Sequence, residues 1–281
     1  MRSALPTAHR RRGVWRWDRR VRVACASWAC ALSACTNADA SANRRVDATA
    51  ASQDSLWRVA PAGEPAASFP APSRPVADIV APRWTDEDDR DDAGEFKRVA
   101  SIAGVRTGMQ VADIGAGDGY YVARLAPMVG AGGRVYGQDI IRDYLHLLDR
   151  RVRAASLGNV TVALGDPHDP RLPSGALDMA FMIHMYHEIE QPFGVLWNLA
   201  SAMRPGGTLV ILDLERPTFG HGTPIALLRC ELTAVGYRER SVTRTGPEEY
   251  VAVFVAPSNA TRPSPSALRT ALERRPCRAP R

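Results

Sequence analysis

One stretch limits the possible folds of this chain more than any other. An apolar, strand-like run at residues 110–114 leads into a glycine-rich turn, and a helical pattern begins at Tyr120. The turn contains Gly115, Gly117 and Gly119. Glycine tolerates left-handed backbone without steric cost, and it lets the backbone approach a bound molecule closely. A strand, a glycine-rich turn and a helix in this order are typical of the nucleotide-binding loops of α/β proteins.

The same alternation continues along the chain. Candidate strands follow at residues 134–139, 160–164, 177–183, 208–214, 239–243 and 250–255. Helical patterns lie at residues 86–103, 120–129, 141–157, 192–203 and 223–235, and Thr85 with Asp88 forms a capping box before the first. Near-continuous apolar strands that alternate with helices predict a parallel sheet covered on both faces.

The connection between the last two strands decides the direction of the final one. Only residues 245–248 join them, and this is too short for a parallel crossover. The sequence therefore predicts an α/β, Rossmann-like, doubly wound sheet of seven strands, mostly parallel, with an antiparallel last strand.

Charge is distributed unevenly along the chain. Residues 1–75 carry a net charge of +7, residues 76–256 carry −6, and residues 257–281 carry +5. Proteins that bind nucleic acid concentrate basic residues on their folded face, because phosphate contacts supply most of the affinity. The acidic core therefore predicts no nucleic-acid partner.

The first 34 residues have the pattern of a bacterial export leader. An arginine-rich start is followed by a charge-free run at residues 23–34, which is too short to remain in a bilayer as a spanning helix. The run ends in Leu32-Ser-Ala-Cys35, which resembles the lipobox of bacterial lipoproteins. The resemblance implies a lipid on Cys35, membrane attachment, and a lipid-anchored or periplasmic protein of the cell envelope. A basic extension on a cytoplasmic protein is the alternative.

Composition predicts the remaining boundaries. Residues 35–75 lack a periodic apolar pattern and are expected to form a flexible tether, and residues 258–281, rich in Pro and Arg, are expected to be a disordered tail. Residues 76–257 then form the folded domain. Cys230 and Cys277 are the two cysteines that follow Cys35, and no pair in the core has metal-ligand spacing. We therefore expect neither a metal site nor a disulfide.

The spacing of the glycines distinguishes between classes of nucleotide site. A dinucleotide site requires a further glycine at position 120, which is Tyr120 here, and no Gly-Lys-Ser/Thr loop is present for a triphosphate. The segment Asp113-Ile-Gly115-Ala-Gly117-Asp-Gly119 resembles the first motif of class I S-adenosylmethionine-dependent methyltransferases. The resemblance implies that Asp113, the three glycines and Tyr120 bind S-adenosyl-L-methionine. The ring of Tyr120 or Tyr121 is expected to contact the sulfonium by a cation–π interaction.

Two further acids are candidate cofactor ligands. Asp139 ends the second strand, where its carboxylate can accept hydrogen bonds from a ribose diol, although an Asp can also cap the following helix. Asp166 precedes Leu172-Pro173 in an arrangement that resembles the adenine-side loop of the same family. The resemblance implies a bond to the exocyclic amine, and a turn-forming role is the alternative.

The candidate catalytic residues follow the fourth strand, in the run His184-Met-Tyr-His187-Glu188. Ligands of open α/β sheets bind beyond the carboxyl ends of the strands, and histidine is the natural general base near neutral pH. We expect His187 to be the base, with Glu188 and His184 as alternatives, and a packing role is also open for either histidine.

The resemblance is strongest to small-molecule transferases of the ubiquinone-biosynthesis-like type, and it implies methyl transfer to a small-molecule acceptor. Two alternatives stay open. One is an envelope lipoprotein that binds S-adenosylmethionine or S-adenosylhomocysteine without catalysis, and the other is a nicotinamide oxidoreductase.

Overall fold

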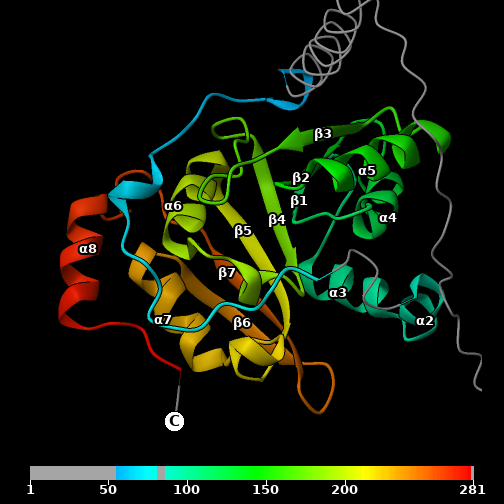
Figure 1. The fold of residues 1–281 in the computed structure, drawn as a ribbon. Helices are drawn as coiled ribbons and strands as arrows, with labels where there is room; N and C mark the ends of the chain where they lie inside the picture. Colours follow the sequence, from blue (N-terminus) through cyan, green and yellow to red (C-terminus); the bar gives the residue numbers. More distant parts are fainter. Residues whose placement is uncertain (1–54, 81–85, 280–281) are drawn as a thin grey trace, which may run out of the picture. The chain divides into compact units, whose positions relative to one another are not determined.

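A computed structural model describes residues 55–80 and 86–279, which all belong to one compact unit, Thr49–Arg281. Seven strands form one sheet in the order β3-β2-β1-β4-β5-β7-β6 (Figure 1). The strands are β1 (Gln110–Ile114), β2 (Arg134–Asp139), β3 (Val160–Leu164), β4 (Leu177–Ile183), β5 (Met203–Leu214), β6 (Arg238–Arg244) and β7 (Glu249–Val255). The first five pair in parallel, and β7 runs antiparallel to both β5 and β6. The predicted fold and the antiparallel final strand are confirmed.

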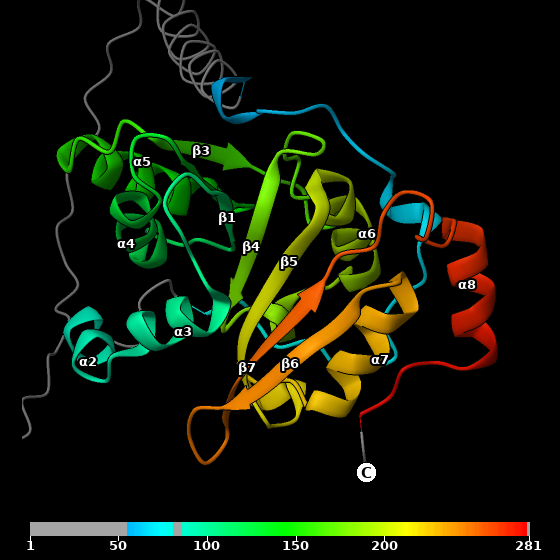
Figure 2. The ribbon, with the colours of Figure 1, turned by 180° about the vertical axis from the view of Figure 1, so that it is seen from behind.

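Helices cover both faces of the sheet, as Figures 1 and 2 show from opposite sides. They are α2 (Glu87–Asp92), α3 (Glu95–Ala103), α4 (Tyr120–Val129), α5 (Arg142–Ala154), α6 (Pro192–Ala202), α7 (Ile225–Val235) and α8 (Pro265–Arg274). Alternate strand residues enter two separate cores. Val111 and Phe181 pack with α3, α4 and α5, whereas Ala112 and Met182 pack with α6 and α7. This two-residue period is what a sheet buried on both faces requires.

The expected helix at residues 86–103 is broken in two. Gly94 adopts a left-handed conformation with φ of 65°, which ends the first turns and starts α3 in a new direction. The side chain of Asp86 accepts a hydrogen bond from Asp88 N at 2.8 Å and caps α2. The predicted cap, Thr85, lies outside the described residues.

The described part of the predicted tether is packed onto the domain, which corrects that prediction for residues 55–75. Trp57 and Phe69 are buried among the core residues. The side chains of Arg74 and Glu231 are fully buried and form an ion pair with 3.0 Å between Nε and Oε1. Tyr186 also donates its hydroxyl to Glu231 Oε2 at 2.8 Å. The folded domain therefore begins well before residue 76.

The prediction that residues 258–281 form a disordered tail is also wrong, because the described part of this segment packs onto the domain. Helix α8 is capped by Ser264, whose hydroxyl accepts a hydrogen bond from Ala267 N at 3.2 Å. The helix buries Leu268 and Leu272 against α7. A disulfide then joins Cys230 in α7 to Cys277, with 5.5 Å between the Cα atoms. The absence of a disulfide was therefore also a wrong expectation.

None of the helices in residues 55–80 and 86–279 is long and apolar enough to cross a membrane. The leader and Cys35 lie outside the described residues, and their assignment stays a prediction.

Candidate functional site

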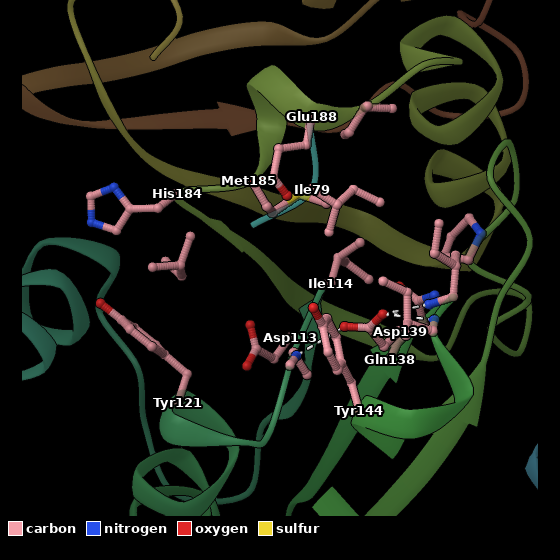
Figure 3. A pocket seen from close by; sticks show the side chains of 18 of the residues that line it. Ile79, Asp113, Ile114, Tyr121, Gln138, Asp139, Tyr144, His184, Met185 and Glu188 are labelled. Atoms are coloured by element: carbon pink, nitrogen blue, oxygen red, sulfur yellow. Dashed lines mark hydrogen bonds between the residues drawn. The ribbon is translucent and has the colours of Figure 1, made fainter. Parts of the chain in front are cut away.

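A cavity of about 230 Å³ opens at the carboxyl ends of β1, β2 and β4. β1 lies between β2 and β4 in the sheet, and the strand order reverses between β1 and β4, which is where α/β sheets bind their ligands. Figure 3 shows side chains from all three strand ends directed into it. The predicted site residues that line it are Asp113, Gly115, Gly117, Tyr120, Asp139, Asp166, His184 and Glu188.

The glycine-rich loop wraps around the end of β2. Gly115 and Gly117 have φ values of 71° and 56°, which a residue with a side chain rarely adopts. The backbone N–H of Ala116 donates to Gln138 O at 2.9 Å, and that of Gly117 donates to Asp139 Oδ2 at 2.9 Å. The loop and the β2 end are thus one hydrogen-bonded unit that forms one wall of the cavity.

Gly119 was predicted to bind the cofactor, but the structure gives it a packing role. It does not line the cavity, and its φ is 94°. A Cβ at this position would lie 2.4 Å from Leu148 Cδ1 on α5. Gly119 is therefore required for the close packing of the loop against α5, and it shapes the cofactor loop indirectly.

Asp139 is the best supported candidate ligand. Its Oδ1 accepts hydrogen bonds from Ile140 N at 2.7 Å and Ile141 N at 2.9 Å, while Oδ2 accepts the bond from Gly117. Burial raises the pKa of Asp139, and the three backbone hydrogen bonds oppose that rise. The carboxylate has capacity for a fourth bond, and it lines the cavity at the place predicted for a ribose diol.

Asp113 adds a second buried acid to the same wall. Burial raises the pKa of Asp113 to about 7; Arg90 lowers it and the nearby Asp139 raises it. Arg90 lines the cavity as well, but it is bound to Glu95, with Nε 3.2 Å from Oε1. When they are ionised, the two acids favour a ligand with a positive centre.

Asp166 lies at the edge of the cavity, where it is paired with two arginines. Its Oδ1 is 2.9 Å from Arg58 Nη2, and its Oδ2 is 3.0 Å from Arg171 Nη1. These partners lower the pKa of Asp166 against the opposing effect of burial. Asp166 can still accept a bond from an amine, but it is a charged member of a network and not only the turn residue of the alternative interpretation.

The proposed contact of Tyr120 with a sulfonium is not supported by the arrangement of its ring. The guanidinium carbons of Arg90 and Arg124 lie 3.8 and 3.7 Å from the ring centroid. The hydroxyl donates to Asp91 Oδ1 at 2.8 Å. Tyr120 lines the cavity, yet its ring already has two cationic partners. The hydroxyl of Tyr121 donates to Glu95 Oε1 at 3.0 Å.

His184 lines the cavity from the turn after β4 (Figure 3). Its φ of 52° is unusual for a residue with a side chain, and backbone of this kind is common at functional turns. Its Nε2 lies 3.7 Å from Glu95 Oε2. Burial would raise the pKa of Glu95, but hydrogen bonds with His184 and Arg90 lower it to about 2. Glu95 is therefore a carboxylate next to the imidazole.

Glu188 faces the cavity from the short 3-10 helix η2 (Tyr186–Glu188). Burial raises the pKa of Glu188. Its Oε1 accepts a hydrogen bond from Val80 N at 3.2 Å, and Tyr144 donates its hydroxyl to Val80 O at 3.3 Å. Val80 and Ile79 thereby lie across the cavity as an apolar wall.

His187 is not placed where a base in this cavity must be, which corrects the leading prediction. The residue is 2% exposed, and it is absent from the cavity wall. Its Nδ1 is 3.0 Å from Oδ1 of the fully buried Asp213, and Thr223 Oγ1 donates to Asp213 Oδ2 at 2.7 Å. Of the two histidines in the run, His184 is the one that reaches the cavity.

The sequence patterns did not indicate several lining residues, among them Arg90, Gln138, Tyr144, Ile79 and Val80. Arg90 and Tyr144 lie on helices whose exposed faces carry many similar polar residues, so their position gave no signal. The apolar pair Ile79-Val80 lies in a short segment that the sequence patterns assigned to no helix or strand.

Comparisons with known proteins agree with this geometry. Residues 111–207 match a family described as "Methyltransferase domain". A demethylmenaquinone methyltransferase of Geobacillus kaustophilus is 28% identical over 41% of this chain and 49% of its own length. The chain spans about half the length of the curated relatives it matches.

Solved structures share the fold. A SAM-dependent methyltransferase from Aquifex aeolicus aligns with a TM-score of 0.55 and 24% identity over 62% of this chain and 100% of its own. The [4+2]-cyclase SpnF aligns with a TM-score of 0.52 and 15% identity over 69% of this chain and 91% of its own. The fold is that of class I S-adenosylmethionine-dependent methyltransferases. The matched region contains the glycine-rich loop, Asp139 and His184, and it supports S-adenosylmethionine as the cofactor.

Proposed function

We propose that this protein transfers the methyl group of S-adenosylmethionine to a small-molecule acceptor. The observation that carries the proposal is the meeting of the glycine-rich loop, Asp139 and His184 in one cavity. The residues fit the cofactor: Asp139 would bind the ribose hydroxyls, Asp166 the adenine amine, and the acids would favour the sulfonium. When bound, this cofactor supplies an activated methyl group.

The task of the protein is then mainly to hold and orient the acceptor. Orientation can lower a barrier of this kind by roughly 7–11 kcal/mol in the best intramolecular models. Ile79, Val80 and Met185 give the cavity an apolar side. His184, next to the carboxylate of Glu95, is positioned to accept a proton from a hydroxyl or amine, and Glu188, which also lines the cavity, is the second candidate.

The acceptor side of the cavity favours an apolar molecule. Apolar side chains contribute much of this wall, and they are Ile79, Val80, Ile114, Ile183, Met185, Ile189 and Val195. The curated relatives include proteins named as demethylmenaquinone and ubiquinone/menaquinone methyltransferases, which supports testing quinone-like acceptors first.

Asp139→Ala is expected to weaken S-adenosylhomocysteine binding by roughly 1.5–3 kcal/mol, the range for hydrogen bonds to a charged group. Part of that loss will come from the glycine-rich loop, because the carboxylate also accepts the N–H of Gly117. Calorimetry on the folded variants measures the effect, with NAD as the comparison ligand. Asp143→Ala, an exposed acid in the first turn of α5, is the matched control. Unchanged affinity in Asp139→Ala, or preference of the wild type for NAD, would contradict the cofactor assignment.

A binding protein without methyl transfer is the second candidate, because the same fold occurs in a protein described as a [4+2]-cyclase. Turnover against a panel of acceptors separates the two. Binding of S-adenosylhomocysteine with no methylated product from any acceptor class would favour the second.

We further propose that the chain is exported and anchored by a lipid on Cys35. The lipobox resemblance motivates the anchor, and the Cys230–Cys277 disulfide supports an oxidising compartment, since such bonds are rare in the cytosol. The expected result is a membrane-bound native protein with an acylated N-terminus at Cys35, lost in Cys35→Ser and kept in the control Cys30→Ser. Fractionation and mass spectrometry test this. A soluble native protein with an unmodified N-terminus and free thiols at Cys230 and Cys277 would overturn it.

A further inference from the structure

The structure brings two histidines and a glutamate together beside the cavity. His187 and Glu188 belong to η2, and His221 follows the short 3-10 helix η3 (Thr218–Gly220), which packs against η2. One ligand atom from each of the three side chains lies within 4.8 Å of the other two. The rings of the two histidines are 5.5 Å apart and nearly perpendicular. His221 is 34 residues from His187 in the sequence, and for that reason ligand spacing did not reveal the group.

The hydrogen bonds around His187 leave one nitrogen available to a ligand. Its Nδ1 is 3.0 Å from Asp213 Oδ1, and Asp213 is held in turn by the hydroxyl of Thr223 at 2.7 Å. Its Nε2 is directed toward Glu188, 4.0 Å from Oε1. Metal-bound histidines almost always have this arrangement, in which the second nitrogen bonds to a carboxylate that fixes the ring and its tautomer.

The backbone of His221 is also consistent with a built site. Its φ is 55°, a left-handed conformation that costs energy for a residue with a side chain. The exposed imidazole of His221 lies near the buried His187 and the half-buried Glu188. Ligands of a tetrahedral zinc ion with bonds of about 2.0–2.2 Å lie ~3.4 Å apart, so the group must contract by less than ~1.5 Å. The exposed His221 is the member that can move.

We propose that His187, Glu188 and His221 bind one divalent transition-metal ion, of the class of Zn²⁺ or Co²⁺. Two imidazoles and one carboxylate suit these ions better than Mg²⁺ or Ca²⁺, which prefer oxygen ligands. Three protein ligands leave a position for water or for an oxygen atom of a bound molecule. Glu188 also lines the cavity, and this places the ion beside the space in which the acceptor would lie. The proposed metal site does not depend on the proposed methyl transfer, because it is inferred only from the positions of His187, Glu188 and His221.

The test uses the full-length chain, freed of metal with a chelator, and titrates it with Co²⁺ while the d–d absorption is recorded; calorimetry with Zn²⁺ follows. The wild type is expected to bind one Co²⁺ with a spectrum typical of four or five ligands. His221→Ala and Glu188→Gln are each expected to weaken binding by more than the 10–100-fold that loss of an outer partner costs. His168→Ala, a half-buried histidine outside the group, is the control and should bind as the wild type does.

Two features of the variants allow a change in Co²⁺ binding to be assigned to this site. All variants retain the leader cysteines, so any Co²⁺ held by thiolates is common to them and cancels in the comparison. His221 is exposed, and His221→Ala is therefore expected to fold, which a melting curve verifies. If wild type and His221→Ala bind Co²⁺ with the same affinity and the same spectrum, the proposal is wrong, and the group is only a hydrogen-bonded network beside η2.

Discussion

Arg74→Met is expected to lower the free energy of unfolding by about 3–5 kcal/mol, because removing one partner of a buried ion pair leaves the other charge without compensation. Both side chains of the Arg74–Glu231 pair are fully buried. Arg74 also donates hydrogen bonds to the backbone carbonyls of His187 at 3.3 Å and Tyr186 at 3.2 Å. Urea unfolding of the wild type and the variant measures the loss. Arg216→Met, in an exposed pair with Glu248, is the matched control and should change stability little.

The pH dependence of this deficit gives a second readout. Burial raises the pKa of Glu231, so the folded protein binds that proton more tightly than the unfolded chain does. A raised carboxyl pKa lowers stability as pH rises from the unfolded pKa through the folded one. Without Arg74 the free-energy cost of holding Glu231 ionised in the folded protein grows. The deficit of Arg74→Met should therefore be largest at neutral pH and shrink below ~4.3, the ordinary pKa of Glu. A deficit that does not vary with pH would contradict an uncompensated charge as its cause.

The core of the fold was predictable because its signals are local. The strands β1 to β4 have the predicted bounds, since each is an apolar run that ends at turn-forming residues. The position of Asp139 at the end of β2 follows from the same pattern, as does the glycine-rich loop beside it. These features depend on neighbours within about ten residues of one another.

The two ends of the domain could not be predicted because their partners are distant in sequence. Arg74 is 157 residues from Glu231, and Cys230 is 47 residues from Cys277. Composition described residues 35–75 as lacking a periodic apolar pattern and residues 258–281 as rich in Pro and Arg, which is correct. It did not show that a few buried side chains, such as Phe69 and Leu268, attach these segments to α6, α7 and the sheet.

The choice among the candidate bases depended on backbone geometry that residue types do not reveal. After β4 the chain turns through a left-handed residue at His184 and then enters η2. Within this short helix, neighbouring side chains leave the axis in different directions. Glu188 faces the cavity, while His187 is directed into the interior toward Asp213 on β5. The pattern of residue types favoured His187, whose side chain does not line the cavity.

His184→Ala is expected to lower turnover by about 10²–10⁴, the usual contribution of a general base, if the acceptor loses a proton. S-adenosylhomocysteine affinity should be nearly unchanged, because Asp139 and the glycine-rich loop are not altered. Turnover with a hydroxyl or amine acceptor, together with calorimetry, measures both quantities. His187→Ala is the comparison variant. Loss of the buried His187–Asp213 bond should lower its stability, whereas the turnover of the folded variant should stay close to that of the wild type.

A variant of Glu95, the carboxylate beside His184, tests whether the two residues act together. Glu95 is a carboxylate whose nearest imidazole nitrogen is His184 Nε2 at 3.7 Å, and removing its charge by Glu95→Gln should reduce turnover through the orientation of that imidazole. If His184 acts with Glu95 as a unit, the double variant should lose little more than His184→Ala alone, because effects within a unit are not additive. Wild-type turnover in His184→Ala would instead assign proton removal to Glu188 or show that the acceptor requires no base. Independent, additive losses in the two single variants would contradict the His184–Glu95 pair while leaving the methyl transfer itself in place.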